Sequence, residues 1–578
     1  MPDYIRRNKA ICWFSLFFAF IIFVKILVFQ HITAGGLMFR SLWNAPLFFW
    51  SWLLPKIAIS VFIASFVFIA KRQYWTVIVG FFIDLWCIAN AIYFRAYDGY
   101  FDIYTIQLGG NMKGFWSSVI FFTSWKDLLF PLLTLTYLPL ALKVINTKRF
   151  WHTPLIGVAL FIALSYFSTG ILIANQEKTD EFSYNDEYIC YNDVFSYNPF
   201  SEQTRKCFHT TSKVGQICST SIIHDAGYII NDYIYLRKNY TIPFIDYNDL
   251  RNMLSTTHIN CMLKNPCIIV IVESLEDWAV NEVSMPHLSK YMKQHPHLHA
   301  HKIKKQTLSG NSADGQLIIN TGLLPLTSGV TCYMFPYNQY PSIADCCSKK
   351  AATILPHSIE SWNQQYMSPA YHYDTTIVRN ANDSILFETT LELLHGGYDC
   401  IQVITLSTHA PFDYGASRSD LVLPQDMPLY MSQYMKSVYY FDSGLNMLLE
   451  QLASDTLLQK TSVIITGDHT IFYHKAREKY HQYVEQNNLN YRVNEGYCPL
   501  IILSDNISET ITIDEPCYQM DIFPTIMHVT GCNDYYWKGL GVNLFDTLAI
   551  KNRELTEEQC YDLSDRLIRN NWFKQYYE

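Results

Sequence analysis

Five long apolar segments crowd into the first 175 residues of this chain, and they constrain its fold more than any other feature. They span residues 11–30, 47–70, 74–94, 127–144 and 151–174. An α-helix needs roughly 20 predominantly apolar residues to cross a bilayer, and each segment is close to that length or above it. The sequence therefore predicts an N-terminal transmembrane bundle of five helices over residues 1–175.

Basic residues lie in alternate loops around these segments. They are Arg6, Arg7 and Lys9 before the first segment, Lys71 and Arg72 after the second, and Lys143, Lys148 and Arg149 after the fourth. Because Lys and Arg concentrate in cytoplasmic loops, we expect the N-terminus inside the cell and everything after residue 174 outside it. Three ionisable residues, Lys25, Lys56 and Asp84, fall within the segments, and for these we favour snorkelling or pairing in the bundle over a functional role.

The composition changes after the membrane segments. Residues 176–264 are polar and rich in Tyr, Asn and Asp, with neither strand alternation nor a long helical period, and we interpret them as a linker. Over residues 265–548, apolar runs at 267–272, 401–406, 462–466 and 500–503 alternate with helix-like stretches. Such runs are typical of buried parallel strands, so this region predicts an α/β domain with a mostly parallel central sheet. A helical tail is expected over residues 549–578.

Charge and cysteine content exclude some classes of partner. The formal net charge is −8 and there is no basic stripe, which argues against nucleic acid as a partner. Two of the 15 cysteines, Cys12 and Cys87, lie in or near membrane segments, and the others follow residue 175. An oxidising exterior would permit disulfides among the latter, but the sequence does not give their connectivity. No paired CxxC arrangement is present, so a cysteine zinc module is not expected.

Ionisable residues follow three of the predicted strands. Glu273 comes after the run at 267–272, His409 lies beyond the run at 401–406, and Asp468 and His469 follow the run at 462–466. Ligands bind beyond the carboxyl ends of strands in open α/β sheets, so these side chains are expected to converge. Singly, each has an ordinary explanation as a helix cap, a turn residue or an exposed histidine. Together they suit a divalent cation such as Mn²⁺, Mg²⁺ or Zn²⁺, with geometry deciding among them.

The stretch SGNSADGQ places Ser312 directly before a helix-like run. A lone serine in this position is commonly an N-cap. However, a cation held by Glu273, Asp468 and His469 would lack one ligand of a tetrahedral shell. Ser312 could supply that ligand, and coordination would make its oxygen a usable nucleophile near neutral pH. Free N–H groups at a helix start also attract phosphate, so the metal set favours the nucleophile over the cap.

Several motifs, in this order behind five apolar segments, give the chain a family resemblance. They are VIVES around Glu273, GNSADGQ around Ser312, LSTHAPF around His409, IITGDH ending at His469, and QMDIFPTIMHVTG over residues 519–531. With them, the chain resembles the lipoteichoic acid synthase family of membrane phosphoglycerol transferases, within the alkaline phosphatase and sulfatase superfamily. The resemblance implies a sulfatase-like α/β domain outside the cytoplasmic (inner) membrane of a bacterium, behind a multi-pass anchor.

The resemblance also implies a set of site residues. One divalent cation is expected, Mn²⁺ first with Mg²⁺ or Zn²⁺ as alternatives, and its ligands would be Glu273, Ser312, Asp468 and His469. The nucleophile would be Ser312, where many members have Thr. Substrate contacts would come from His409, Trp362, Gln364 and His357. Gln364 stands in SWNQ where the family has a phosphate-binding Arg, and it offers neutral hydrogen bonds in place of a charged fork.

The predicted activity is transfer of a phosphoglycerol group from a phospholipid, such as phosphatidylglycerol, to an envelope glycan or lipid acceptor through a covalent intermediate on Ser312. The alternatives are phosphoethanolamine transfer, hydrolysis of another phosphoester or sulfuric ester, and a non-enzymatic glycan-binding role. Formylglycine-type sulfatases need Pro and Arg two and four positions after the modified residue, whereas Asp314 and Gln316 stand there. Phosphate chemistry is therefore favoured over sulfate chemistry, and the oligomeric state stays open.

Overall fold

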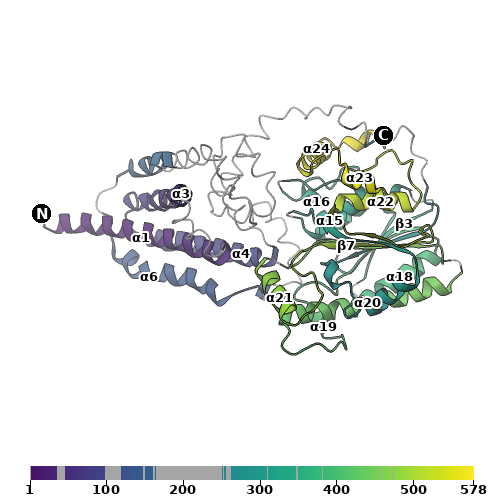
Figure 1. The fold of residues 1–578 in the computed structure, drawn as a ribbon. Coiled ribbons are helices and arrows are strands. Elements are labelled where there is room, and N and C mark those ends of the chain that lie inside the picture. The colour runs from purple at the N-terminus through teal and green to yellow at the C-terminus, as the bar shows by residue number, and fades with distance from the viewer. Residues whose placement is uncertain are drawn as a thin grey trace. The chain divides into compact units, whose positions relative to one another are not determined.

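The computed structural model separates into two compact units, an N-terminal set of helices and a C-terminal α/β domain (Figure 1). It describes residues 2–34, 46–97, 119–120, 122–146, 150–160, 163–164, 250, 253–254, 262–308, 310–327, 329–346, 349–379, 382–456, 458–472 and 474–577. Most of the predicted linker at 176–264 lies outside these residues, so its extent stays a prediction. Each unit is described by itself below.

The N-terminal unit is built from apolar helices. They are α1 (Pro2–Ala34), α3 (Pro46–Ser65) with the short η1 (Phe66–Phe68), α4 (Tyr74–Tyr97), and α6 (Leu129–Lys143) with η3 (Trp125–Leu128) before it. Among the described helices, two are long and apolar enough to cross a membrane, over Lys9–Phe29 and Tyr74–Arg95, with mean hydropathies of 2.6 and 2.0. Residues 165–174 of the predicted fifth segment lie outside the described ranges. The apolar N-terminal helices are thus confirmed, and a count of five spans stays a prediction.

A buried ion pair joins three of these helices. Lys25 Nζ on α1 donates to Asp84 Oδ1 on α4 at 2.5 Å and to the Gly80 carbonyl oxygen at 3.2 Å, and it also contacts the Thr134 hydroxyl on α6. That hydroxyl donates to Asp84 Oδ2 at 2.5 Å. The side chains of Lys25 and Asp84 are 1% and 3% exposed, so both charges are paired inside the bundle, as expected from the sequence.

We expect Lys25→Met to destabilise the helical unit by about 3 kcal/mol, because it leaves the Asp84 carboxylate buried without its cation. The measurement is unfolding of the detergent-solubilised chain by SDS titration. The double variant Lys25→Met/Asp84→Leu removes both charges and should recover most of the loss. If the double variant were as unstable as the single one, side-chain packing rather than charge pairing would explain the effect.

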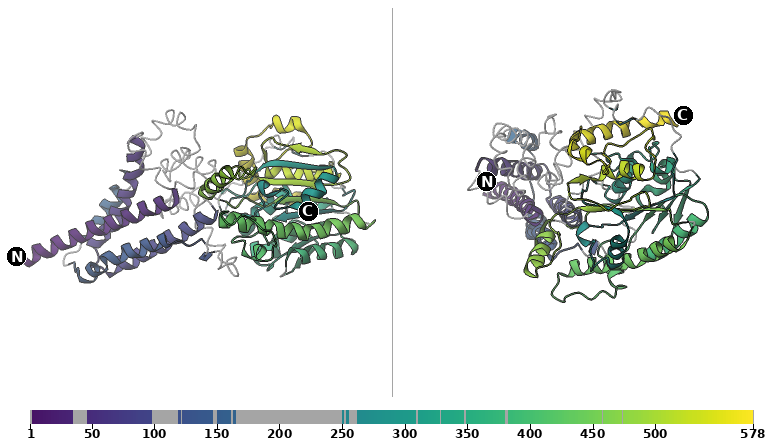
Figure 2. Two further views of the ribbon diagram at one scale, coloured as in Figure 1. Left: turned by 60° about the horizontal axis from the view of Figure 1, so that its bottom comes forward. Right: turned by 45° about the vertical axis from the view of Figure 1, so that its right-hand side comes forward.

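A mixed sheet forms the centre of the C-terminal unit. Nine strands belong to it within the described part of the chain, in the order β4-β3-β5-β1-β6-β7-β2-β8, with β9 pairing β2. They are β1 (Cys267–Val272), β2 (His297–Lys304), β3 (Ala351–Leu355), β4 (Thr375–Val378), β5 (Cys400–Ile404), β6 (Ser462–Gly467), β7 (Cys498–Leu503), β8 (Ile511–Ile513) and β9 (Cys517–Tyr518). Helices cover both faces of the sheet, with α15 (Ser312–Thr321) and α22 (Ile522–Val529) on one and α18 (Asp383–His395) and α20 (Leu429–Ser454) on the other (Figures 1 and 2).

The central sheet is mixed, because one of the predicted strands runs antiparallel to its neighbours. The run at 500–503, predicted as a parallel strand, lies in β7, which is antiparallel to both of its neighbours, β6 and β2. The other pairs between described strands are parallel. All six residues of β7 are buried. An apolar run indicates that a strand is buried on both faces of a sheet, but it does not indicate the direction of the strand. The sequence therefore could not distinguish a parallel from an antiparallel strand here.

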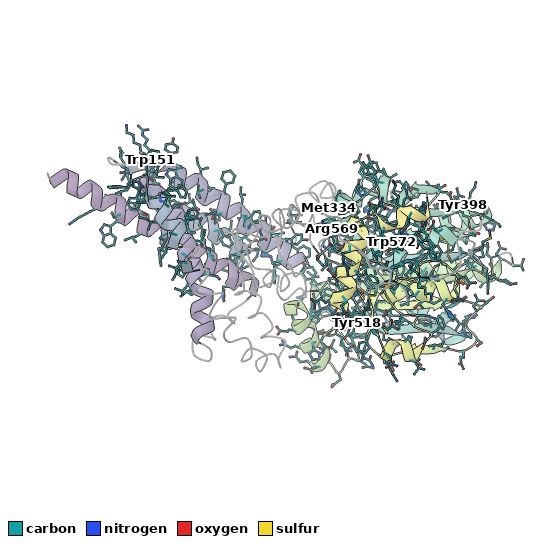
Figure 3. All side chains as sticks on the ribbon, turned by 90° about the horizontal axis from the view of Figure 1, so that it is seen from above. Trp151, Met334, Tyr398, Tyr518, Arg569 and Trp572 are labelled. Atoms are coloured by element: carbon teal, nitrogen blue, oxygen red, sulfur yellow. The ribbon has the colours of Figure 1, made fainter. Side chains whose placement is uncertain are left out.

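The C-terminal helices pack onto the core of the α/β domain. They are α23 (Thr547–Lys551), α24 (Glu557–Arg569) and η8 (Trp572–Tyr576), and they fall in the region predicted as a helical tail. Leu563 and Leu567 of α24 are buried in the same cluster as Ile318 of α15. At the end of α24, Arg569 lies over the Phe335 ring, 5.9 Å from its centroid, near Met334 (Figure 3). The segment is therefore part of the domain's core rather than an appendage.

Candidate active site

Pairing between neighbouring strands brings the first two site residues together. Val272 ends β1 and is in register with Gly467, which ends the parallel strand β6. The next residues along the chain, Glu273 and Asp468, therefore emerge side by side at the same edge of the sheet. His469 follows, and its Nε2 lies 3.4 Å from Glu273 Oε1 and 3.6 Å from Asp468 Oδ2.

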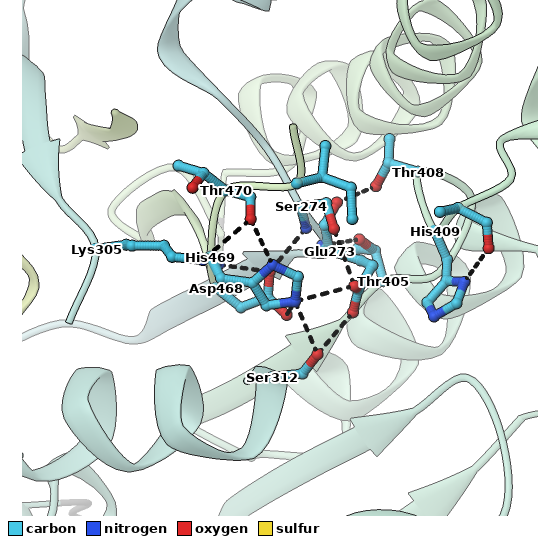
Figure 4. A network of polar contacts seen from close by, with 12 residues as sticks. Glu273, Ser274, Lys305, Ser312, Thr405, Thr408, His409, Asp468, His469 and Thr470 are labelled. Carbon is cyan, nitrogen blue, oxygen red and sulfur yellow. Dashed lines mark hydrogen bonds and ion pairs between the residues drawn. The ribbon is translucent and has the colours of Figure 1, made fainter. Parts of the chain in front are cut away.

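Ser312, the first residue of α15, completes this cluster (Figure 4). Its hydroxyl donates to Glu273 Oε2 at 3.1 Å and lies 3.3 Å from His469 Nε2. The N-cap of the helix is Asn311, and no side chain there makes a capping hydrogen bond. The N-cap alternative for Ser312 is thus wrong, because its hydroxyl points to the acidic cluster.

Two glycines and an aspartate of the SGNSADGQ stretch fix this position. A Cβ atom on Gly315 would lie 2.5 Å from the carbonyl oxygen of Asp468, so only glycine lets α15 approach the end of β6 so closely. Asp314 Oδ2 accepts hydrogen bonds from the backbone N–H groups of Leu308 and Gly310, both at 2.9 Å. The turn that presents Ser312 is therefore held by its own neighbours in the sequence.

The charges of the cluster call for a cation. The side chains of Glu273, Asp468 and His469 are 8%, 2% and 4% exposed. Burial, with the adjacent charge of Glu273, raises the pKa of Asp468 to about 7. Burial opposes ionisation of Glu273 as well, but the hydrogen bond and charge of His469 hold the pKa of Glu273 below its ordinary value. Two buried carboxylates that cannot both ionise freely are the surroundings a divalent ion would neutralise.

The possible ligand atoms of His469 and Asp468 also lie on the side of the cluster. His469 Nδ1 lies 3.2 Å from the carbonyl oxygen of Thr470, to which it can donate, so that a cation replacing the proton on Nε2 would meet the Nε2 lone pair on the side of the cluster. Asp468 Oδ1 accepts from the backbone N–H groups of Ser274 at 2.7 Å and His469 at 2.8 Å. Asp468 Oδ2 remains on the side of His469 Nε2. The residues present therefore fit a divalent cation.

Three supporting residues were not predicted from the sequence. Ser274 has a positive φ of 57° and turns its N–H to Asp468. Thr405 Oγ1 accepts from the Glu273 N–H at 3.3 Å, and the Thr408 hydroxyl donates to the Glu273 carbonyl oxygen at 2.5 Å (Figure 4). These residues lie inside the VIVES motif or just before His409, so nearness to a motif was the only signal that could have found them.

Three of the predicted substrate contacts differ in their surroundings. His409 lies to one side of it, and its Nδ1 is 2.6 Å from the Ala410 carbonyl oxygen (Figure 4). His357 is close enough for the charge of Glu273 to act on it, although its burial lowers its pKa. Trp362 has a left-handed backbone, with φ of 52°, and packs against the core cluster. These roles stay predictions.

Gln364 is engaged within the protein. Its Nε2 donates to Gln316 Oε1 at 2.6 Å, and its Oε1 accepts from the Ser368 hydroxyl at 2.9 Å. Gln364 is 3% exposed, and Gln316 lies one turn along α15 from Ser312. The amide thus ties α17 (Gln364–Ala370) to the helix that carries the candidate nucleophile.

The α/β domain has a sulfatase-like fold of the alkaline phosphatase type, and comparison with known proteins agrees. Residues 336–532 match the family model for the sulfatase domain, and residues 1–192 match that for the lipoteichoic acid synthase N-terminal domain. The predicted resemblance is therefore confirmed, to lipoteichoic acid synthases in the N-terminal part of the chain and to sulfatases in the α/β domain.

Whole-length relatives extend this agreement. A lipoteichoic acid synthase from Staphylococcus saprophyticus is 20% identical over 563 residues, covering 89% of this chain and 82% of the relative. Lipoteichoic acid synthase 2 from Bacillus subtilis is 20% identical over 534 residues, covering 86% and 78%. The structure of lipooligosaccharide phosphoethanolamine transferase A from Neisseria meningitidis shares the fold, with a TM-score of 0.50, 10% identity, and coverage of 90% of this chain and 95% of that one.

Proposed function

We propose that this protein is a membrane-anchored, metal-dependent transferase that moves a phosphoglycerol group from a phosphatidylglycerol-like phospholipid to an envelope glycan or lipid acceptor. The observation that carries the proposal is the Ser312 hydroxyl, which starts a helix and lies 3.1 Å from Glu273 Oε2 and 3.3 Å from His469 Nε2. The similarity to lipoteichoic acid synthases supports the choice of phosphoglycerol. Five membrane spans in the bacterial cytoplasmic membrane, with the α/β domain outside, complete the proposed arrangement.

The reaction has two half-steps on one serine. Ser312 Oγ attacks the lipid phosphorus, a new O–P bond forms, and the bond from phosphorus to the diacylglycerol oxygen breaks. Diacylglycerol leaves with a proton, for which His409 is the proposed donor. Ser312 loses its own proton to solvent in the first half-step. In the second, an acceptor hydroxyl attacks the same phosphorus and gives its proton to His409, the Ser312–phosphorus bond breaks, and the serine oxygen takes up a proton from solvent. The hydrogen bond from the Ser312 hydroxyl to Glu273 aims its proton away from the attacking lone pair.

Glu273, Ser312, Asp468 and His469 would hold the divalent ion, with Mn²⁺ as the first candidate and Mg²⁺ or Zn²⁺ as alternatives. The ion would supply charge stabilisation at the phosphoryl oxygens and a lowered pKa for the serine oxygen. Ser312 begins α15, and the N-terminus of a helix favours an anion such as the phosphoryl group. His409, Trp362, Gln364 and His357 are the proposed residues around the transferred group.

The identity of the donor is tested by the adduct it leaves. The purified chain in detergent is incubated with phosphatidylglycerol or with phosphatidylethanolamine, quenched in acid, digested and weighed by mass spectrometry. We expect a phosphoglycerol adduct on the peptide that contains Ser312 from the first lipid only. An adduct from phosphatidylethanolamine alone would assign the protein to phosphoethanolamine transfer, and no adduct from either lipid would overturn the covalent mechanism.

A further inference from the structure

A second cluster of metal-binding side chains lies on strand β2, outside the candidate active site. The strand has the sequence HLHAHKIK, and its alternation places three histidines, His297, His299 and His301, on one face. Leu298 and Ala300 lie on the other face, in the core cluster. A strand with histidines at every second position on a largely buried face offers imidazoles at fixed spacing, which is how protein metal sites are often built.

A carboxylate from another element meets two of these histidines. Asp277 begins η4 (Asp277–Ala279), four residues after Glu273, and its backbone N–H donates to the Tyr497 carbonyl oxygen at 2.9 Å. Asp277 Oδ1 lies 3.0 Å from His299 Nε2 and 3.1 Å from His301 Nδ1, and Asp277 Oδ2 lies 3.1 Å from His301 Nδ1. The three side chains each offer one ligand atom, and these atoms lie within 4.8 Å of one another.

These separations suit a tetrahedral ion. Nitrogen and oxygen ligands bind Zn²⁺ at about 2.0–2.1 Å, so two of them at a tetrahedral angle are roughly 3.3 Å apart. The contacts from Asp277 to the two histidines would need to open by only a few tenths of an ångström. The fourth position of the shell would be left for water or another small ligand.

The partial exposure of the three side chains gives an ion access to the cluster, and their net charge favours its binding. The side chains of His299, Asp277 and His301 are 8%, 12% and 27% exposed, so the site is held in the protein and open on the side of His301. Two neutral imidazoles and one carboxylate carry a single negative charge, which favours a divalent cation. Arg492 is the nearby positive group that acts on His301, and it is paired with Asp514 at 3.6 Å.

We propose that Asp277, His299 and His301 form a second cation site, with Zn²⁺ as the ion that it binds best. Its ligand set differs from that of the candidate active site: two of three ligands are imidazoles, which suit zinc, whereas the other cluster is mainly oxygen, which suits manganese. A bound ion would fix the segment after Glu273 to strand β2. The proposal does not depend on the transferase activity.

The test counts ions in the full-length chain, purified in detergent, stripped with EDTA and re-equilibrated with Zn²⁺. We expect two zinc ions per chain in the unmodified protein and one in Glu273→Gln, which weakens the candidate active site. His301→Ala should also leave one, and Glu273→Gln/His301→Ala none. With Co²⁺ in place of Zn²⁺, Glu273→Gln should show the visible absorption of a tetrahedral site, and the double variant should lose it.

His395→Ala is the matched control. His395 Nε2 pairs with Asp455 Oδ2 at 2.8 Å on the surface, so this change removes a His–Asp pair without touching the cluster, and the count should stay at two. Asp277→Asn is a second test of the cluster. It removes the charged ligand but keeps hydrogen bonding to the histidines, so a loss of zinc in this variant would not be explained by a folding defect of His301→Ala. If Glu273→Gln bound no zinc, or if Asp277→Asn and His301→Ala bound as much as the unmodified chain, the cluster would be a hydrogen-bonded group only. A failure of the transferase proposal would leave the ion in Glu273→Gln unaffected, so the two failures are distinguishable.

Discussion

Ser312→Ala should stop phosphoglycerol transfer, with turnover falling by roughly 10⁴-fold or more, as when the nucleophile is removed from other covalent catalysts. The physical reason is that, among the residues that the structure describes, the Ser312 hydroxyl is the one that contacts both Glu273 and His469, and it lies at the start of α15. The measurement is release of diacylglycerol from phosphatidylglycerol by the full-length chain in detergent, together with the mass of the peptide containing Ser312.

Ser312→Thr is the matched control, since threonine keeps the hydroxyl. We expect it to retain measurable turnover and to carry the adduct, while Ser312→Ala shows neither. Thermal unfolding of both variants close to that of the unmodified chain would exclude a folding defect. Diacylglycerol release by Ser312→Ala at an undiminished rate would rule out this serine as the nucleophile.

The gathering of the active-site residues could be predicted from the sequence because it depends on strand ends. Glu273 and Asp468 each follow an apolar run, and parallel neighbours in a sheet bring such positions together. The position of Ser312 followed from the same logic with a glycine-rich turn before a helix. What the runs could not give was direction, so β7 was predicted parallel although it pairs antiparallel with β6 and β2.

Contacts between polar side chains that are far apart in the chain could not be predicted from the sequence. β2 was not predicted because its alternating histidines give it no apolar run, and the meeting of His299 and His301 with Asp277 was therefore not foreseen. The sequence shows that Gln364 departs from the family pattern. It does not show that the amide of Gln364 hydrogen-bonds Gln316. Such contacts depend on how close two elements lie once the domain has packed, and a local sequence pattern does not contain that distance.

A buried ion pair close to the candidate active site supports the segment that follows His469. Glu276 is fully buried, and its carboxylate accepts from Arg477 Nη1 at 2.8 Å and Nη2 at 2.6 Å. It also accepts from Trp278 Nε1 at 2.8 Å and from the Ile471 N–H at 2.9 Å. Burial works against ionisation, but the Arg477 guanidinium and these donors keep the pKa of Glu276 below its ordinary value. The carboxylate thus joins the end of β1 to the chain just beyond β6.

Glu276→Ala should lower the free energy of unfolding of the α/β domain by about 3–5 kcal/mol, because it removes the buried counter-charge of Arg477 and the acceptor of the Ile471 and Phe472 N–H groups, while Arg477 Nη1 keeps its bond to the Val493 carbonyl oxygen. Urea unfolding of the full-length chain in detergent, followed by tryptophan fluorescence, measures the loss. The control is Asp562→Ala, which removes the partner of Arg566 in a pair at 3.0 Å whose aspartate is 70% exposed. Exposed i,i+4 pairs contribute about 0.3–0.5 kcal/mol, so the control should change little. If Glu276→Ala cost no more than this control, the Glu276–Arg477 pair would not support the segment that follows His469.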